Sequence, residues 1–93
     1  MKIFVLSLAF LSEVNAVCRN LKAASRQDCQ KICDLVANCE TWTFEKDLKD
    51  CLIKHRDGWT RKPSPFRDSG VKNQGPWYEP DVDYYGGDIE CPE

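Results

Sequence analysis

The side chains of this sequence that can do covalent or metal chemistry are chiefly six cysteines, accompanied by a single histidine, His55. Cysteine thiols can hold zinc or form disulfides, and the compartment decides between the two outcomes. An N-terminal export signal, described below, directs the chain to an oxidising compartment, where thiols pair. We therefore predict a disulfide framework, with no metal site and no cofactor.

The other polar residues form no recognisable catalytic set. A nucleophile needs a neighbouring base, and one histidine among oxidised thiols supplies no such pair. Asp81 and Asp83 lie in a polar segment where we expect exposed carboxylates, and Gly86-Gly87 lacks the flanking pattern of a phosphate-binding loop. The net charge of −2 argues against nucleic-acid binding. We predict that the protein is not an enzyme.

The first residues, Met1–Ala16, have the pattern of a secretory signal peptide. Lys2 is followed by an apolar run from Ile3 to Leu11, and small or polar residues then lead to a cleavage site after Ala16. The run holds about nine residues, whereas a membrane span takes roughly 20. We expect a secreted, extracellular protein without a membrane span.

The chain that remains is short for a fold held by apolar burial alone. A domain of this size buries too little surface to be stable without covalent or metal staples. Six cysteines in an exported chain are typical of such staples, although their spacing alone allows 15 pairings.

A helix is predicted over Arg26–Ala37. Ser25 and Asp28 have the spacing of a capping box, in which both side chains satisfy backbone donors at a helix start. Asn38 suits the end of the helix because it tolerates the left-handed conformation. Four residues recur at helical spacing and define one buried face: Cys29, Ile32, Cys33 and Val36.

Two strands are predicted after the helix. Thr41–Glu45 alternates β-branched and aromatic residues, and Cys51–Lys54 is a second short β-prone run. The polar residues between them fit a hairpin loop. Trp42 and Phe44 point to one side of the first strand, so we expect them to form the floor on which the helix packs.

The cysteines and strands occur in a distinctive order along the chain. The pieces are Cys29-x3-Cys33-x5-Cys39, Thr41–Phe44, Asp50–Lys54 and Ser69–Lys72. Together, over roughly Ala24 to Lys72, they resemble the PAN/apple domain family, the plasminogen N-terminal, apple and nematode modules. The resemblance implies an α+β fold, in which residues 17–73 form a small disulfide-stapled module with one helix packed on a curved antiparallel sheet.

The same resemblance implies two disulfides. Cys29 would pair with Cys51 and tie the helix to the sheet, and Cys33 would pair with Cys39 across the helix end.

Residues 74–93 form an acidic aromatic tail that permits two interpretations. In one, similar to the apple arrangement, the tail is the closing strand of the module and Cys18 pairs with Cys91, which leaves no odd thiol. In the other, Val82–Cys91 resembles the opening strand of a PAN module and begins a second repeat. The two interpretations stay open at this point.

Charge is distributed unevenly along the second half of the chain. Five basic residues and one acidic residue lie between Lys54 and Arg67, whereas six acidic residues and no basic residue follow Asn73. Because His55–Asp68 shows no strand or helix period, we expect a long loop or sheet edge there. The candidate ligand-binding residues are Lys54, Arg56, Trp59, Arg61, Lys62 and Arg67.

Two interpretations of this basic segment are open. It could dock an anionic partner such as a sulfated or sialylated glycan, or its charges could pair with the acidic tail. The function that the resemblance implies is a secreted, non-enzymatic recognition or adhesion module, which binds extracellular glycans or proteins alone or in tandem repeats. The alternative is a small secreted structural or inhibitory protein that uses the disulfides only as a frame for its loops.

Overall fold

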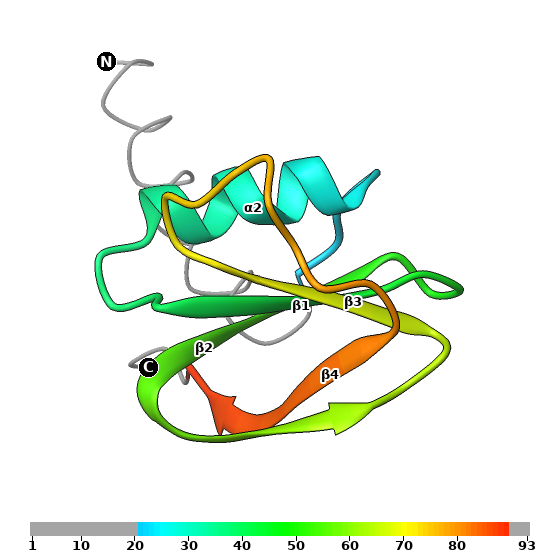
Figure 1. Cartoon of the computed structure of the whole chain (residues 1–93). Coiled ribbons are helices and arrows are strands. Elements are labelled where there is room, and N and C mark those ends of the chain that lie inside the picture. Colours follow the sequence, from blue (N-terminus) through cyan, green and yellow to red (C-terminus); the bar gives the residue numbers. More distant parts are fainter. Residues whose placement is uncertain (1–20, 90–93) are drawn as a thin grey trace.

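The computed structural model describes residues 21–89, in which one helix lies across a four-stranded antiparallel sheet (Figure 1). The sheet has the strand order β3-β1-β2-β4. The predicted signal peptide, Met1–Ala16, and the two outer cysteines, Cys18 and Cys91, lie outside the described residues. The elements are α2 (Arg26–Leu35), β1 (Thr41–Glu45), β2 (Asp50–Pro63), β3 (Arg67–Val71) and β4 (Val82–Asp88).

The helix begins where the sequence predicts and ends two residues early. The Ser25 hydroxyl accepts a hydrogen bond from the Asp28 backbone N–H at 3.2 Å. At the other end, Val36 is already extended, whereas the prediction continued the helix to Ala37. Cys33 and Cys39 are joined with Cα atoms 5.3 Å apart. Six residues of helix rise about 9 Å, so the chain must leave the helix to close this bridge.

The core lies between α2 and the sheet. Trp42 and Phe44, the aromatic residues predicted to face the helix, are 1% and 5% exposed. They pack in one cluster with Cys29 and Cys33 of α2 and with Ile53 of β2. The predicted fold class, one helix on an antiparallel sheet with disulfides, is therefore confirmed.

Two disulfides are present among the described residues, and they are the pairs that the resemblance implies. Cys29 and Cys51 have Cα atoms 5.4 Å apart and connect α2 to β2, while Cys33 and Cys39 connect the helix to the segment that leads into β1. All four sulfurs belong to residues that are at most 2% exposed, so both bridges lie inside the core cluster.

The opposite face of β1 is covered by β4 because the sheet is curved (Figure 1). Ser69 of β3 donates its hydroxyl proton to the Val82 carbonyl at 2.8 Å, so Thr43 donates to Ser69 at 2.7 Å. Thr43 in turn accepts from the Tyr84 backbone N–H at 3.1 Å. Each of these buried hydroxyls is thus satisfied, and together they join β1, β3 and β4.

Of the two expectations for His55–Asp68, a long loop or a sheet edge, the loop is wrong, and most of the segment is strand in the outer part of the sheet. β2 continues to Pro63, and β3 begins at Arg67. The outer part of β2 pairs with β4, from Trp59 opposite Gly86 to Pro63 opposite Val82. Both faces of this part are largely exposed, which explains why its sequence has no alternation of apolar and polar residues.

The two ends of the described chain lie at the same edge of β2. The Leu21 carbonyl accepts from the Cys51 N–H at 2.9 Å, and the Ile89 N–H donates to the Ile53 carbonyl at 3.0 Å. Residues 51 and 53 are about 7 Å apart along a strand. Within the described residues, no helix has the length and apolar character needed to cross a membrane.

Candidate ligand-binding groove

Most of the cations proposed from the sequence as ligand-binding residues are engaged inside the domain. The Lys54 side chain is only 2% exposed, and its Nζ lies 2.5 Å from a carboxylate oxygen. Arg61 Nε donates to both oxygens of its partner at 2.9 and 3.0 Å. These ion pairs are Lys54–Asp88, Arg61–Glu79 and Arg67–Asp83. The alternative that the basic segment pairs with the acidic tail therefore describes these three residues.

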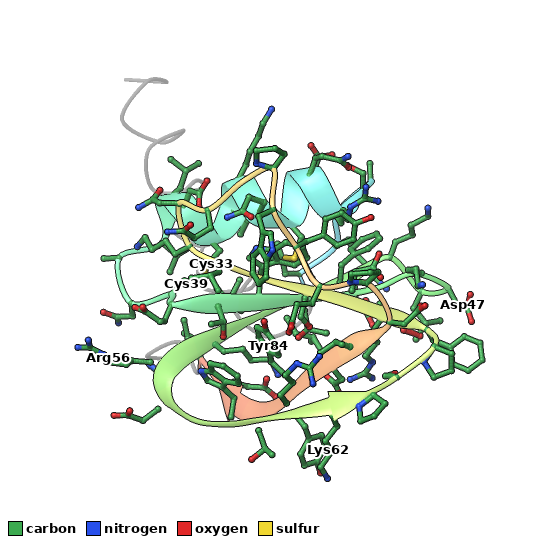
Figure 2. All side chains as sticks on the ribbon, in the orientation of Figure 1. Cys33, Cys39, Asp47, Arg56, Lys62 and Tyr84 are labelled. Carbon is green, nitrogen blue, oxygen red and sulfur yellow. A yellow bond between two sulfur atoms is a disulfide. The ribbon has the colours of Figure 1, made fainter. Side chains whose placement is uncertain are left out.

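The remaining candidates do not form one surface. Trp59 stacks on Tyr84 with ring centroids 4.3 Å apart. Lys62 Nζ lies 4.6 Å from the centre of the Tyr85 ring. Arg56 and Lys62 are both exposed, but they are six residues apart on β2 and point away from the molecule in different directions (Figure 2).

Tyr84 and Glu79 form an electrostatic network with Arg61. The Tyr84 hydroxyl donates to Glu79 Oε1 at 2.8 Å. The hydrogen bond from Arg61 holds the pKa of Glu79 below its ordinary value, and the bond from Tyr84 acts in the same direction. Burial, reinforced by the contact with Glu79, raises the pKa of Tyr84. The network is thus a fixed structural link between β2, β4 and the segment before β4.

A groove of about 330 Å³ lies on the other side of the molecule, between α2 and the connection from β3 to β4. That connection crosses in front of the helix in Figure 1. Trp42 of β1 also lines the groove, and the full lining comprises Arg26, Gln27, Gln30, Lys31, Asp34, Trp42 and Gly75–Tyr78. The helical members recur at spacings of one, four, five and eight residues from Arg26, which places them along one side of α2.

Polar contacts attach the connection to the helix. Gln30 Nε2 donates to the Val71 carbonyl at 2.8 Å and to Asp34 Oδ1 at 2.9 Å. Asp34 Oδ1 also accepts from the Asn73 backbone N–H at 2.7 Å. At Gly75 a Cβ would lie 3.3 Å from Gln30 Cγ, so a small residue lets the connection approach the helix. These contacts set the width of the groove.

The aromatic side chains of the connection complete the groove. The Arg26 guanidinium carbon lies 3.9 Å from the centre of the Tyr78 ring, and Tyr78 packs against the core cluster. Trp77 is 51% exposed. Trp42 is buried, and its indole Nε1 has no hydrogen-bond partner in the structure. The groove therefore combines an exposed aromatic side chain with charged and amide side chains from α2.

The candidate residues taken from the sequence and the residues of this groove do not overlap. Trp77 and Tyr78 could have been selected, because two aromatic residues in a polar tail imply a surface to pack against. No signal marks Arg26, Gln27 or Lys31, because polar residues on the outer side of a helix are ordinary. They line a groove only because the connection lies against them, and the connection follows about fifty residues further along the chain.

A concave, partly aromatic groove is the kind of surface in which ligands commonly bind. The PAN domain family model matches residues 9–85, so the chain belongs to the PAN domain family. The match extends beyond Lys72 into β4. PAN domains are protein- or carbohydrate-binding modules and are generally non-catalytic. No curated protein and no solved structure matched the chain in the same comparisons.

Proposed function

We propose that this PAN domain is a secreted, non-enzymatic recognition module that binds an extracellular carbohydrate in the groove between α2 and residues 75–78. The observation that carries the proposal is the placement of the half-exposed Trp77 opposite a helix face rich in hydrogen-bonding side chains. The groove volume of about 330 Å³ is within the usual range for small-ligand sites.

The chemistry of the groove suits a sugar ring. A pyranose has an apolar face of C–H groups and a rim of hydroxyls. An indole such as that of Trp77 offers a rigid apolar surface to the C–H face of the sugar. The side chains of Gln27 and Lys31 offer amide and ammonium groups that can donate hydrogen bonds to the hydroxyl oxygens of the rim. These side chains come from a helix fixed by a disulfide to the sheet, so binding requires little ordering of the protein.

The proposal is tested by binding of the secreted protein to a panel of immobilised glycans. Replacement of a large aromatic side chain at the centre of an interface typically costs more than about 1.4 kcal/mol, which is a tenfold loss of affinity. We expect at least that loss for Trp77→Ala. The matched control is Tyr85→Ala, because Tyr85 is also an exposed aromatic residue, 59% accessible, and does not line the groove.

Two outcomes would overturn the proposal. Equal loss of binding in both variants would mean that the effect of Trp77→Ala is not specific to the groove. Absence of binding to every glycan would favour the alternative of a structural or inhibitory protein, or of a protein ligand.

A further inference from the structure

The groove carries two cations, Arg26 and Lys31. Within residues 21–89, neither Arg26 nor Lys31 forms an ion pair, whereas five other cations do. Those five are Lys22, Lys46, Lys54, Arg61 and Arg67. Of the six cations in the described residues that form no ion pair, two, Arg26 and Lys31, lie together at the groove, although the whole chain has a net charge of −2.

The acidic residue that lines the groove is already engaged. Asp34 Oδ1 accepts from Gln30 Nε2 at 2.9 Å and from the Asn73 N–H at 2.7 Å. Its carboxylate holds the connection to the helix and forms no ion pair with Arg26 or Lys31 in the described part of the chain. The groove consequently has two basic groups and one acidic group, and the basic groups are the ones that remain for a ligand.

Arg26 is held in a defined position. Its guanidinium carbon lies 3.9 Å from the centre of the Tyr78 ring, at a distance where the cation and the π-system attract each other. A guanidinium fixed in this way presents a planar set of N–H donors that matches the two oxygens of a carboxylate. Less side-chain entropy is lost on binding than for a free arginine, because the ring contact already restrains the group.

We propose that the groove selects saccharides that carry a carboxylate, such as uronic or sialic acid residues, with Arg26 bonding the carboxylate and Trp77 contacting the sugar ring. Lys31 adds positive charge to the same site. This inference rests on the proposed function, since it names the class of sugar that the groove binds. It differs from the hypothesis of a basic segment over Lys54–Arg67, because none of the six residues suggested there lines the groove.

The test compares acidic glycans with their carboxyl-reduced forms, in which each carboxylate is replaced by a hydroxymethyl group. Separate arms contain glycans with terminal sialic acid, glycans with glucuronic acid, and sulfated glycans without a carboxylate. Charge-assisted hydrogen bonds contribute more than about 1.4 kcal/mol, so we expect reduction to weaken binding at least tenfold in the sialic or the glucuronic arm. The sulfated arm should bind no better than the reduced forms.

The matched variants are Arg26→Gln and Arg56→Gln, which make the same change of charge. Arg26→Gln should lower the affinity for the acidic glycan to that of its reduced form, while Arg56→Gln should leave it unchanged. Thermal melting shows whether each variant is folded. We expect both variants to be folded at the temperature of the binding assay, because neither arginine forms an ion pair within the described residues and the single contact of Arg26 with the Tyr78 ring adds little to the stability of the fold.

Each failure points to a different error. If acidic and reduced glycans bind equally and Trp77→Ala still abolishes binding, the carboxylate inference is overturned and the carbohydrate groove stands. If both arginine variants weaken binding alike, or sulfated glycans bind as tightly as carboxylated ones, the site responds to charge in general and the inference is overturned. If no glycan binds, the proposed function falls with it.

Discussion

Gly70 is the position at which one added methyl group tests the packing of the whole domain. It lies opposite Trp42 in the register of β3 and β1. A Cβ on Gly70 would lie 2.4 Å from Trp42 Cζ2 and 2.6 Å from Cε2. The indole is 1% exposed and is packed against the disulfides, so it cannot move away without displacing the core.

The expected magnitude follows from two opposing effects. Inserting a methyl group into a filled core costs about 1–3 kcal/mol of the free energy of unfolding. A glycine-to-alanine change returns about 0.4–1 kcal/mol, because alanine restricts the unfolded chain. For Gly70→Ala we therefore expect a net loss of about 1–2 kcal/mol. In a domain of this size, that loss lowers the melting temperature by roughly 4–16 °C.

Urea unfolding of the native and Gly70→Ala proteins measures this loss. The cause is checked by repeating the substitution in a Trp42→Phe background. The smaller phenyl ring lacks the outer atoms of the indole that would meet the new methyl group. The two changes should then couple, and Gly70→Ala should cost less than in the native protein. An equal cost in both backgrounds, or no cost in the native background, would refute the steric explanation.

Three further predictions concern the bridges and the charge network. Replacing Cys29 and Cys51 together by Ser removes a link across 22 residues and should lower the free energy of unfolding by about 3.4 kcal/mol through chain entropy. Urea unfolding measures this loss, and a loss under about 1 kcal/mol would show that the link is dispensable. For Glu79 the lowered pKa means that its ionised form stabilises the fold above the unfolded pKa of about 4.3, and that this contribution is lost as the pH falls through the lower folded pKa. The stability difference between native protein and Glu79→Gln should therefore shrink on acidification below about pH 4.3, whereas a difference independent of pH would contradict the role of the Arg61 contact. Finally, because Leu21 and Ile89 bond the same edge of β2, we predict that Cys18 pairs with Cys91 and that Cys91→Ser costs about 4.4 kcal/mol; unchanged melting would favour the interpretation in which the tail opens a second repeat.

Much of the fold could be predicted because its signals are local. The Ser25 cap lies three residues from the N–H that it binds. The alternation of β-branched and aromatic residues over Thr41–Glu45 likewise indicates β1 from neighbouring residues alone. The family resemblance added the two disulfide pairs. The outer part of β2 has no such signal in the sequence, because its two faces are largely exposed and its pairing partner is β4, 19 to 27 residues later in the chain.

The candidate site was less predictable for a related reason. The basic residues on β2 are conspicuous in the sequence, yet the ion pairs that engage Lys54 and Arg61 form with residues of the later tail. Arg26 looks like an ordinary surface residue, and it becomes notable only when Tyr78 returns to the helix. Charge can be counted from a sequence, but its neutralisation depends on contacts between distant segments.

The convergence of Leu21 and Ile89 on neighbouring positions of β2 has a practical consequence for protein engineering. The chain enters and leaves the described domain at points whose hydrogen-bonding partners are about 7 Å apart. A surface turn in an unrelated host protein spans a comparable gap, so the host chain could continue on either side of an inserted copy with little distortion. The domain is therefore suited to transplantation into the middle of another chain as well as to fusion at either end.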